Sequence, residues 1–344
     1  MSVADYKCPN CSSTLKFNPK TQKWNCEYCN SQFGLNDLNS NDLKYQNVEQ
    51  NKKIDIYSCS NCGAEIITDS NTSATFCVYC KSTAIIKNRL VNELEPNKII
   101  PFATTREEAI NAFKKMCSKR ILVPKAFKDQ KNIEEIKGVY IPFWLFDVNC
   151  SGSLLYKAQK EDSREDQNYK VITTKYYKVE REGTIYFNNI PVDGSVNFDD
   201  AAMNSIEPFD YTGLKDFNYG YLSGFYAEKY GLTDADVGHI AMERAKSSFI
   251  DYLDNDINGY TSKTLKEENI DNRIINVQYV LLPVWLLNIK YKEEFRTFAM
   301  NGQTGKMAGN LPIDKLKMFI LAVIIFILLF VAVVLGFYSV GWCL

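Results

Sequence analysis

The stretch YKCPNCSSTLKFNPKTQKWNCEYCNSQF, residues 6–33, determines how the start of the chain folds, and YSCSNCGAEIITDSNTSATFCVYCKSTA, residues 57–84, repeats its pattern. Both stretches read C-x2-C-x14-C-x2-C, with an offset of 51 residues at every cysteine. The first set is Cys8, Cys11, Cys26 and Cys29, and the second set is Cys59, Cys62, Cys77 and Cys80. The constant offset indicates an internal duplication.

Each C-x2-C pair places two thiolates on one tight turn, and two such turns complete a tetrahedron around a Zn²⁺ ion. Short strands at 14–17 and 23–24, on either side of the turn signal Asn18-Pro19, would fold the second pair onto the first. We therefore predict two zinc ribbons, at residues 1–34 and 55–90, each holding one ion with four cysteine thiolates. The polar residues 35–54 would link them.

Two other uses of these cysteines remain open. Disulfides favour oxidising compartments, and the polar start MSVADYKCPN is no secretory signal. A rubredoxin-like iron also takes four thiolates. Four cysteines leave no open position for water or substrate, so a structural role is favoured over a catalytic one. The remaining cysteines, Cys117, Cys150 and Cys343, lie apart from both sets.

The C-terminal segment predicts a membrane helix at residues 316–338. Its core, MFILAVIIFILLFVAVVLGFY, contains no charged residue and is long enough to cross a hydrocarbon layer of about 30 Å. Lys315 and Lys317 precede it, and no basic residue follows, so the positive-inside rule places the N-terminal part in the cytoplasm. A single helix without polar residues is expected to be an anchor rather than a transport path.

Residues 95–312 have the composition of a folded domain, and they contain a second repeat. VYIPFWLFDV, residues 139–148, aligns with VLLPVWLLNI, residues 280–289. Each apolar run predicts a buried strand, in which a proline implies a bulge, a strand start or an edge position. The expected fold class is α+β, with two related lobes that arose by internal duplication.

Two helices flank these runs, at residues 105–119 and 233–253. The first begins with a capping box, made by Thr104 or Thr105 with Glu107 or Glu108. The expected buried residues are Ala109, Ile110, Phe113, Met116 and Cys117 in the first helix, and Val237, Ile240, Ala241, Phe249 and Tyr252 in the second. Residues 169–187 alternate like a pair of strands, and Asn301-Gly302 predicts a hairpin turn.

No catalytic set can be assembled from the sequence. The single histidine, His239, falls on the polar side of a predicted helix. Carboxylates at 193, 199, 200 and 207 could meet in a site, but surface positions are the default, as core packing is for the aromatic residues of 217–230. The segment GQTGK at 302–306 lacks the full phosphate-loop pattern. We therefore do not expect an enzyme.

Charge argues against the main alternative, a membrane-tethered nucleic-acid-binding protein. Residues 1–90 carry a formal charge of +2, which two zinc–tetrathiolate centres would lower to −2, and the whole chain carries −1. Proteins that bind nucleic acid usually show a concentrated basic surface. A thiol-redox protein with labile cysteines is a third possibility.

The cysteine pattern, together with YIPFWLFD, PVDGS, IEPFDY, YLSGFYAEKY and NGQTGKMAGNLP, resembles a bacterial family. This family is described as TFIIB-type zinc-ribbon membrane proteins, which are YdjG-like and loosely labelled PriA-like. The resemblance implies that all eight ribbon cysteines bind metal. It also implies a membrane-associated complex with phage-shock or SPFH-type scaffold proteins. The sequence thus favours a non-catalytic, membrane-anchored cytoplasmic adaptor.

Overall fold

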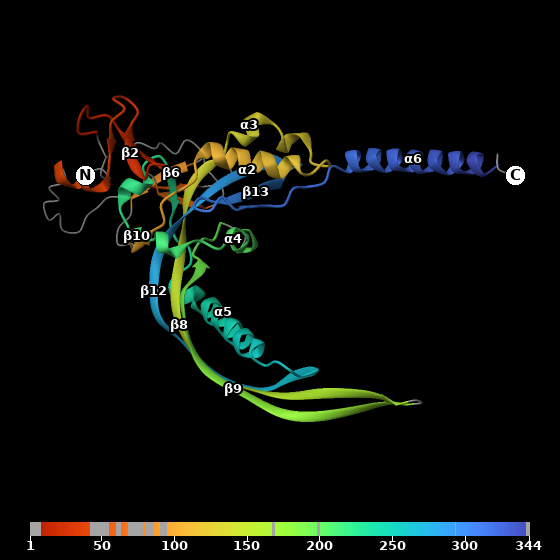
Figure 1. The fold of residues 1–344 in the computed structure, drawn as a ribbon. Helices are drawn as coiled ribbons and strands as arrows, with labels where there is room; N and C mark the ends of the chain where they lie inside the picture. Colours follow the sequence, from red (N-terminus) through yellow and green to blue (C-terminus); the bar gives the residue numbers. More distant parts are fainter. Residues whose placement is uncertain are drawn as a thin grey trace.

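The computed structural model describes residues 8–41, 55–59, 63–67, 77, 79, 85–89, 95–166, 169–197, 200–292 and 294–341. It is an α+β molecule in which a small N-terminal sheet packs beside a large one (Figure 1). Two long structures project from the body: the strands β8 and β9, and the C-terminal helix α6.

The N-terminal sheet contains the hairpin expected from the first cysteine pattern, together with a third short strand that was not predicted. It consists of β1 (Leu15–Asn18), β2 (Lys23–Cys26) and β3 (Gln32–Phe33), paired antiparallel in that order. The turn between β1 and β2 closes because the amide of Gln22 donates to the carbonyl of Asn18 at 2.9 Å. Helix α1 (Leu35–Asn41) follows and occupies the first part of the predicted linker.

The large sheet follows the order β10-β7-β12-β8-β11-β5-β4-β6, with β9 added to β8, β13 added to β12 and β14 added to β13. Its strands are β4 (Asp55–Cys59), β5 (Glu65–Ile67), β6 (Ile85–Arg89), β7 (Lys98–Ile99), β8 (Lys137–Asp166), β9 (Tyr169–Asp193), β10 (Lys215–Asp216), β11 (Tyr226–Glu228), β12 (Ser262–Tyr291), β13 (Glu294–Asn301) and β14 (Met307–Ala308). The helices are α2 (Arg106–Ser118), α3 (Gln130–Ile133), α4 (Asp200–Ile206), α5 (Asp234–Asn255) and α6 (Lys315–Gly341), with short 3₁₀ turns η1 (Lys125–Phe127), η2 (Tyr211–Gly213) and η3 (Tyr219–Leu222).

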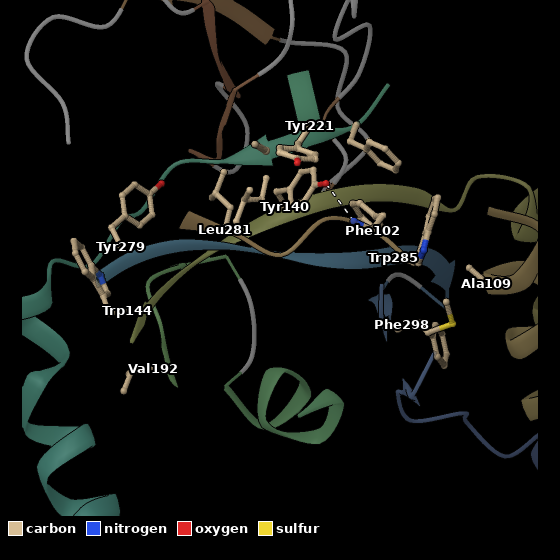
Figure 2. Close-up of a cluster of buried hydrophobic side chains, with 14 of the residues drawn as sticks. Phe102, Ala109, Tyr140, Trp144, Val192, Tyr221, Tyr279, Leu281, Trp285 and Phe298 are labelled. Carbon is tan, nitrogen blue, oxygen red and sulfur yellow. Dashed lines mark hydrogen bonds between the residues drawn. The ribbon is translucent and has the colours of Figure 1, made fainter. Parts of the chain in front are cut away.

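The two apolar runs are the centre of this sheet. They lie in β8 and β12, which pair antiparallel, so that Pro142 faces Leu281 and Pro283 faces Tyr140. Successive side chains alternate between two separate clusters, because strand side chains point to opposite faces. Tyr140 and Trp144 belong to one cluster, part of which Figure 2 shows, whereas Ile141 and Phe143 belong to the other.

Both prolines stand where the outer neighbour of their strand changes. Beside Pro142, the partner of β8 changes from β11 to β9, and beside Pro283 the partner of β12 changes from β7 to β13. The carbonyls of Pro142 and Pro283 accept from the amides of Gly194 at 2.9 Å and Gly302 at 2.7 Å. The amide that each proline lacks therefore falls at a gap between neighbouring strands, which is a local edge inside the sheet.

Corresponding residues of the two runs make corresponding contacts. The indole of Trp144 donates to the carbonyl of Leu232 at 2.8 Å, and the indole of Trp285 donates to the hydroxyl of Thr104 at 2.9 Å. Leu232 and Thr104 each precede the N-cap of a long helix. Likewise, the parallel pairing of β11 with β8 begins at Val139, and that of β7 with β12 begins at Val280.

The two predicted helices are present as α2 and α5. Each begins with a complete capping box, made by Thr105 with Glu108 and by Thr233 with Asp236. Helix α2 contacts β13 through Phe113 and Phe298, whose ring centroids lie 4.9 Å apart, and α5 packs on β8, β9 and β12. The predicted faces are buried, except that Met116 and Ile240 are only partly buried and Tyr252 is exposed. Tyr252 is exposed because it lies just outside the strip of α5 that faces the sheet.

Residues 169–187 do not form the strand pair that their alternation suggested. They belong to the single 25-residue strand β9, which pairs antiparallel with β8 from Asp166 and Tyr169 to Phe143 and Asp193. A period of two identifies strands but not their ends, and no strong turn signal interrupts this stretch. The Asn301-Gly302 turn is confirmed, since the Asn301 side chain accepts from the amides of Gln303 and Thr304, both at 2.9 Å.

The apolar C-terminal segment forms helix α6, which is long and apolar enough to span a membrane. Asp314 caps its start by accepting from the amide of Leu316 at 3.1 Å. The base of the helix is attached to the body, because the amide of Asp314 donates to Leu122 at 2.8 Å and the Lys317 ammonium donates to Val123 at 2.5 Å. From there the described side chains of α6 point into open space.

Candidate metal centre

The first four cysteines lie on two tight turns of the same geometry. At each turn, the amide of the first cysteine donates to the carbonyl five residues later: Cys8 to Ser13 at 2.7 Å, and Cys26 to Ser31 at 2.9 Å. Ser12 and Asn30 hold corresponding positions with φ near +60°. Strand pairing of Leu15 with Cys26 then brings the turns together.

The four sulfur atoms of Cys8, Cys11, Cys26 and Cys29 lie within 4.8 Å of one another. Two of the pairs, Cys8 with Cys29 and Cys11 with Cys26, lie 3.4 Å apart. A tetrahedron with metal–sulfur bonds of about 2.3 Å has edges of about 3.8 Å, so a small contraction or expansion suffices to hold an ion. This cluster can therefore hold a metal such as zinc.

The surroundings of the sulfurs favour thiolates at part of the cluster. Hydrogen bonds from the Ser31 hydroxyl and amide lower the pKa of Cys29 to about 6, and hydrogen bonds from the Cys29 and Tyr28 amides lower the pKa of Cys26. The Ser13 amide lowers the pKa of Cys11, but burial and the neighbouring sulfurs outweigh it and raise the value to about 12. A cation is needed to hold all four as thiolates.

The ribbon is docked on the body through aromatic side chains. Phe17, Trp24 and Tyr221 form a triangle in which every pair of ring centroids is 5.2 Å apart. The indole of Trp24 donates to the carbonyl of Gly220 at 2.9 Å, and the hydroxyl of Ser223 donates to the carbonyl of Leu15 at 2.5 Å. The ribbon core is thus continuous with one face of the large sheet.

A cleft of about 560 Å³ lies where the ribbon meets the body. Lys16 and Asn25 line it from the ribbon, and Arg106 and Lys137 line it from the starts of α2 and β8. Burial, followed by the charge of Arg106, lowers the pKa of Lys137. Glu27 and Glu107 also line the cleft, so it presents polar groups of both charges from two parts of the molecule.

The second cysteine segment is described only in part. Cys59 and Cys77 are buried, whereas Cys62 and Cys80 lie outside the described residues. At Cys59 the turn repeats that of the first segment: its amide donates to the carbonyl of Ala64 at 2.9 Å, and Gly63 has a φ of +76°. Gly63 corresponds to Ser12 at the offset of 51 residues.

Unlike the first segment, the second is part of the large sheet. Strand β5 pairs antiparallel with β11, with Ile67 opposite Ala227. Lys229 and Glu65 form an ion pair at 2.9 Å, and the amide of the Asn288 side chain donates to the carbonyl of Tyr79 at 2.8 Å. Cys59 and Cys77 belong to the core cluster on the other face of β8 and β12.

A buried carboxylate beside this segment escaped the sequence analysis. Glu228, which is 1% exposed, accepts hydrogen bonds from the Ser195 hydroxyl at 2.7 Å and the Asn197 amide at 2.5 Å. Burial raises the pKa of Glu228 to about 6, against the effect of these hydrogen bonds. Burial and the charge of Glu228 raise the pKa of Tyr79, which follows Cys77 by two residues. The sequence signal for this buried carboxylate is the single glutamate in the short strand sequence YAE, residues 226–228.

Within the described residues, no other group of three or more candidate ligands lies close enough to share a metal ion. His239 is exposed on α5, as expected. Asp193 lies near Tyr79, whereas Glu207 lies 3.7 Å from Arg244, and burial raises the pKa of Glu207. Asp199 and the side chain of Asp200 lie outside the described residues. Of the remaining cysteines, Cys117 and Cys150 are buried in the core, and Cys343 is also outside the description.

Comparison with known proteins identifies the family. Over 315 residues, covering 92% of each chain, this chain is 37% identical to the uncharacterized protein YdjG of Bacillus subtilis (strain 168). The chain belongs to the YdjG family. No family model matches the sequence, and no solved structure matches it. This YdjG family member thus combines a four-cysteine cluster with a helix long and apolar enough to span a membrane.

Proposed function

We propose that this YdjG family member is a non-catalytic, membrane-anchored adaptor whose zinc ribbons and α+β body bind proteins at the cytoplasmic surface. The observation that carries the proposal is the four-sulfur cluster of the first cysteine segment, here called ribbon 1 (Cys8, Cys11, Cys26, Cys29 and strands β1–β3). Four protein sulfurs complete the coordination of Zn²⁺, so an ion held there stabilises the fold and has no open position for a substrate. The ribbon is small, and the metal supplies stability that its core cannot.

A second zinc centre, made by Cys59, Cys62, Cys77 and Cys80, is part of this proposal. The turn at Cys59 has the hydrogen bonds and the positive φ of the turn at Cys8, which supports the same use of the same pattern. We expect two zinc ions per chain, four thiolates each. The indoles of Trp144 and Trp285 make corresponding hydrogen bonds, each to the residue before a helix N-cap. This similarity supports an origin of the two lobes by duplication.

Helix α6 would anchor the chain in the cell membrane with a single pass. Its apolar side chains find no partner within the described part of the molecule, and a bilayer supplies one. The lysines at its start favour a cytoplasmic body, and thiolate centres favour the same reducing compartment. The family resemblance suggests SPFH-type or phage-shock proteins as partners in a membrane complex.

Crosslinking in native membranes, followed by purification of the full chain in mild detergent, tests the adaptor function. We expect defined protein partners to co-purify, and we expect Cys8→Ser to reduce their recovery, since ribbon 1 and the adjoining cleft offer the binding surface. Cys117→Ala, which alters a buried cysteine outside the cluster, is the matched control and should retain them. Recovery of the chain alone, or equal recovery with both variants, would contradict the proposal.

The anchor can be tested separately by replacing residues 316–338 with an unrelated apolar helix. If α6 serves only as an anchor, the chimera should remain in the membrane and keep its partners. Loss of partners with intact membrane insertion would show instead that α6 recognises another membrane helix. Binding of the purified chain to DNA at low salt would favour the nucleic-acid alternative.

A further inference from the structure

The outer ends of β8 and β9 form a two-stranded ribbon that extends beyond the rest of the sheet. The pairing of β12 with β8 ends where Ser262 faces Gln159, whereas β8 and β9 remain paired as far as Asp166 and Tyr169. Seven further residues of β8 reach about 23 Å at about 3.3 Å per residue. Thr261 supports the base of this extension, since its hydroxyl accepts from the amide of Glu161 at 2.9 Å.

The end of this two-stranded ribbon exposes large apolar and aromatic side chains. The exposed fractions are 74% for Tyr169, 54% for Val171, 56% for Ile172 and 64% for Tyr176. Because strand side chains alternate, Tyr169 and Val171 lie on one face and Ile172 and Tyr176 on the other. An isolated pair of strands is marginally stable in water, so apolar groups on both of its faces indicate a contact with a less polar surface.

The position of the extension identifies that surface. In Figure 1 the end of the β8–β9 ribbon and helix α6 extend from the body in the same direction. A bilayer crossed by α6 would therefore lie on the side of the body toward which the end of β8 and β9 extends. The 169–178 part of β9 contains three lysines, Lys170, Lys175 and Lys178, and no acidic residue. The paired stretch 160–166 of β8 contains two basic and four acidic residues, so the two stretches together carry a net charge of +1. Tyrosine rings and long lysine side chains suit the headgroup region, where one end is apolar and the other is hydrated.

We propose that residues 160–166 and 169–178 make a second membrane contact, in which Tyr169, Val171 and Ile172 enter the headgroup region of the bilayer that α6 crosses. The inference depends on the membrane anchor proposed above. Two contacts, one at α6 and one at the β8–β9 end, would fix the orientation of the body relative to the membrane. The space between them, on the side of the sheet that α5 covers, would then face the lipid.

Quenching of tryptophan fluorescence by brominated phosphatidylcholine tests this contact in the full chain reconstituted into vesicles. The probe is Ile172→Trp, in a background carrying Trp342→Phe. The matched control is Ile275→Trp, which replaces an equally exposed isoleucine on β12, away from the end of the ribbon. We expect several-fold stronger quenching at 172 than at 275, with a further increase when phosphatidylglycerol is included.

The outcomes separate the membrane contact from the anchor. Equal quenching at both positions, with the chain still resistant to carbonate extraction, would overturn the second contact and leave the anchor in place. Extraction of the chain by carbonate would overturn both. A blue-shifted emission at 172 without quenching, together with crosslinks between copies, would assign the ribbon end to a second copy of the chain and would also overturn the proposal.

Discussion

The two cysteine segments share one pattern but occupy different places in the structure. Ribbon 1 forms a sheet of its own and packs through aromatic rings on one face of the β8–β12 pair. The second segment pairs with β11, so it is part of the large sheet, and its described cysteines pack on the opposite face. A repeated sequence therefore determines the local turn, whereas the surrounding strands determine how strongly that turn is coupled to the body.

The largest expected difference concerns loss of a cysteine. Cys8→Ser should remove one zinc equivalent and release ribbon 1 while the body stays folded. Cys59→Ser should remove the other equivalent and also destabilise the body, because β4 and β5 are held in the large sheet through β11. Structural zinc contributes about 10–16 kcal/mol to the folding of small zinc-binding peptides, so both effects should be large. Metal analysis and hydrogen exchange measure them.

Hydrogen exchange in β8 and β12 discriminates between the two cysteine variants. Protection of these strands should persist in Cys8→Ser and fall in Cys59→Ser. The same loss of protection in both variants would show that the two segments are equally coupled to the body, and the distinction between a docked and an integrated segment would then be wrong.

The sequence predicted the local features of the two cysteine segments and of the body, but not how distant strands pair. It predicted the β1–β2 hairpin, the four-sulfur cluster, the capping box of α2 and the long apolar helix, because each depends on residues close together in the chain. The capping box of α5 was not predicted, although Thr233 and Asp236 have the same spacing. The sequence also did not predict the pairing of β5 with β11, the single strand β9 or the buried position of Glu228. These depend on which distant strands meet, and a period of two does not specify partners.

A second prediction concerns the docking of ribbon 1. Trp24 is 1% exposed, and it fills the space between the ribbon and Tyr221. Trp24→Ala should cost about 3–5 kcal/mol of docking free energy, the usual range for removing a buried tryptophan. The cluster should keep its zinc, since Trp24 supplies no ligand. Proteolysis of the ribbon in the folded chain measures undocking, and loss of zinc together with the ribbon would contradict the separation of docking from metal binding.

A third prediction uses the buried glutamate beside the second segment. The pKa of Glu228 is raised to about 6 in the folded chain, so the folded state binds this proton more tightly than the unfolded state does. Stability from this group is full below about pH 4.5 and is lost as the pH rises through 6. The pKa of Glu228 in the folded chain is about 1.5 above its ordinary value of 4.5, which corresponds to about 2 kcal/mol of lost stability at pH 8.

Glu228→Gln should therefore stabilise the chain by about 1–2 kcal/mol at pH 8 and change little at pH 4.5, since the amide oxygen can still accept from Ser195 and Asn197. Unfolding by denaturant at both pH values measures the difference. Glu27→Gln, on the exposed surface of ribbon 1, is the control and should not reproduce it. Destabilisation by Glu228→Gln at pH 8 would instead mean that the carboxylate is held charged by a partner, such as a bound cation.

The smallest expected effects come from the ion pairs that join each segment to the body. Lys20 and Glu108 lie 2.6 Å apart and are about half exposed, whereas Lys229 and Glu65 lie 2.9 Å apart and are more buried. Exposed pairs contribute about 0.2–1 kcal/mol, and salt screens them. We expect Lys20→Ala to cost less than Lys229→Ala, and the cost of Lys20→Ala to vanish at high salt. Denaturation at two salt concentrations measures both. A larger cost for Lys20→Ala would mean that electrostatics, and not the aromatic triangle, holds ribbon 1 on the body.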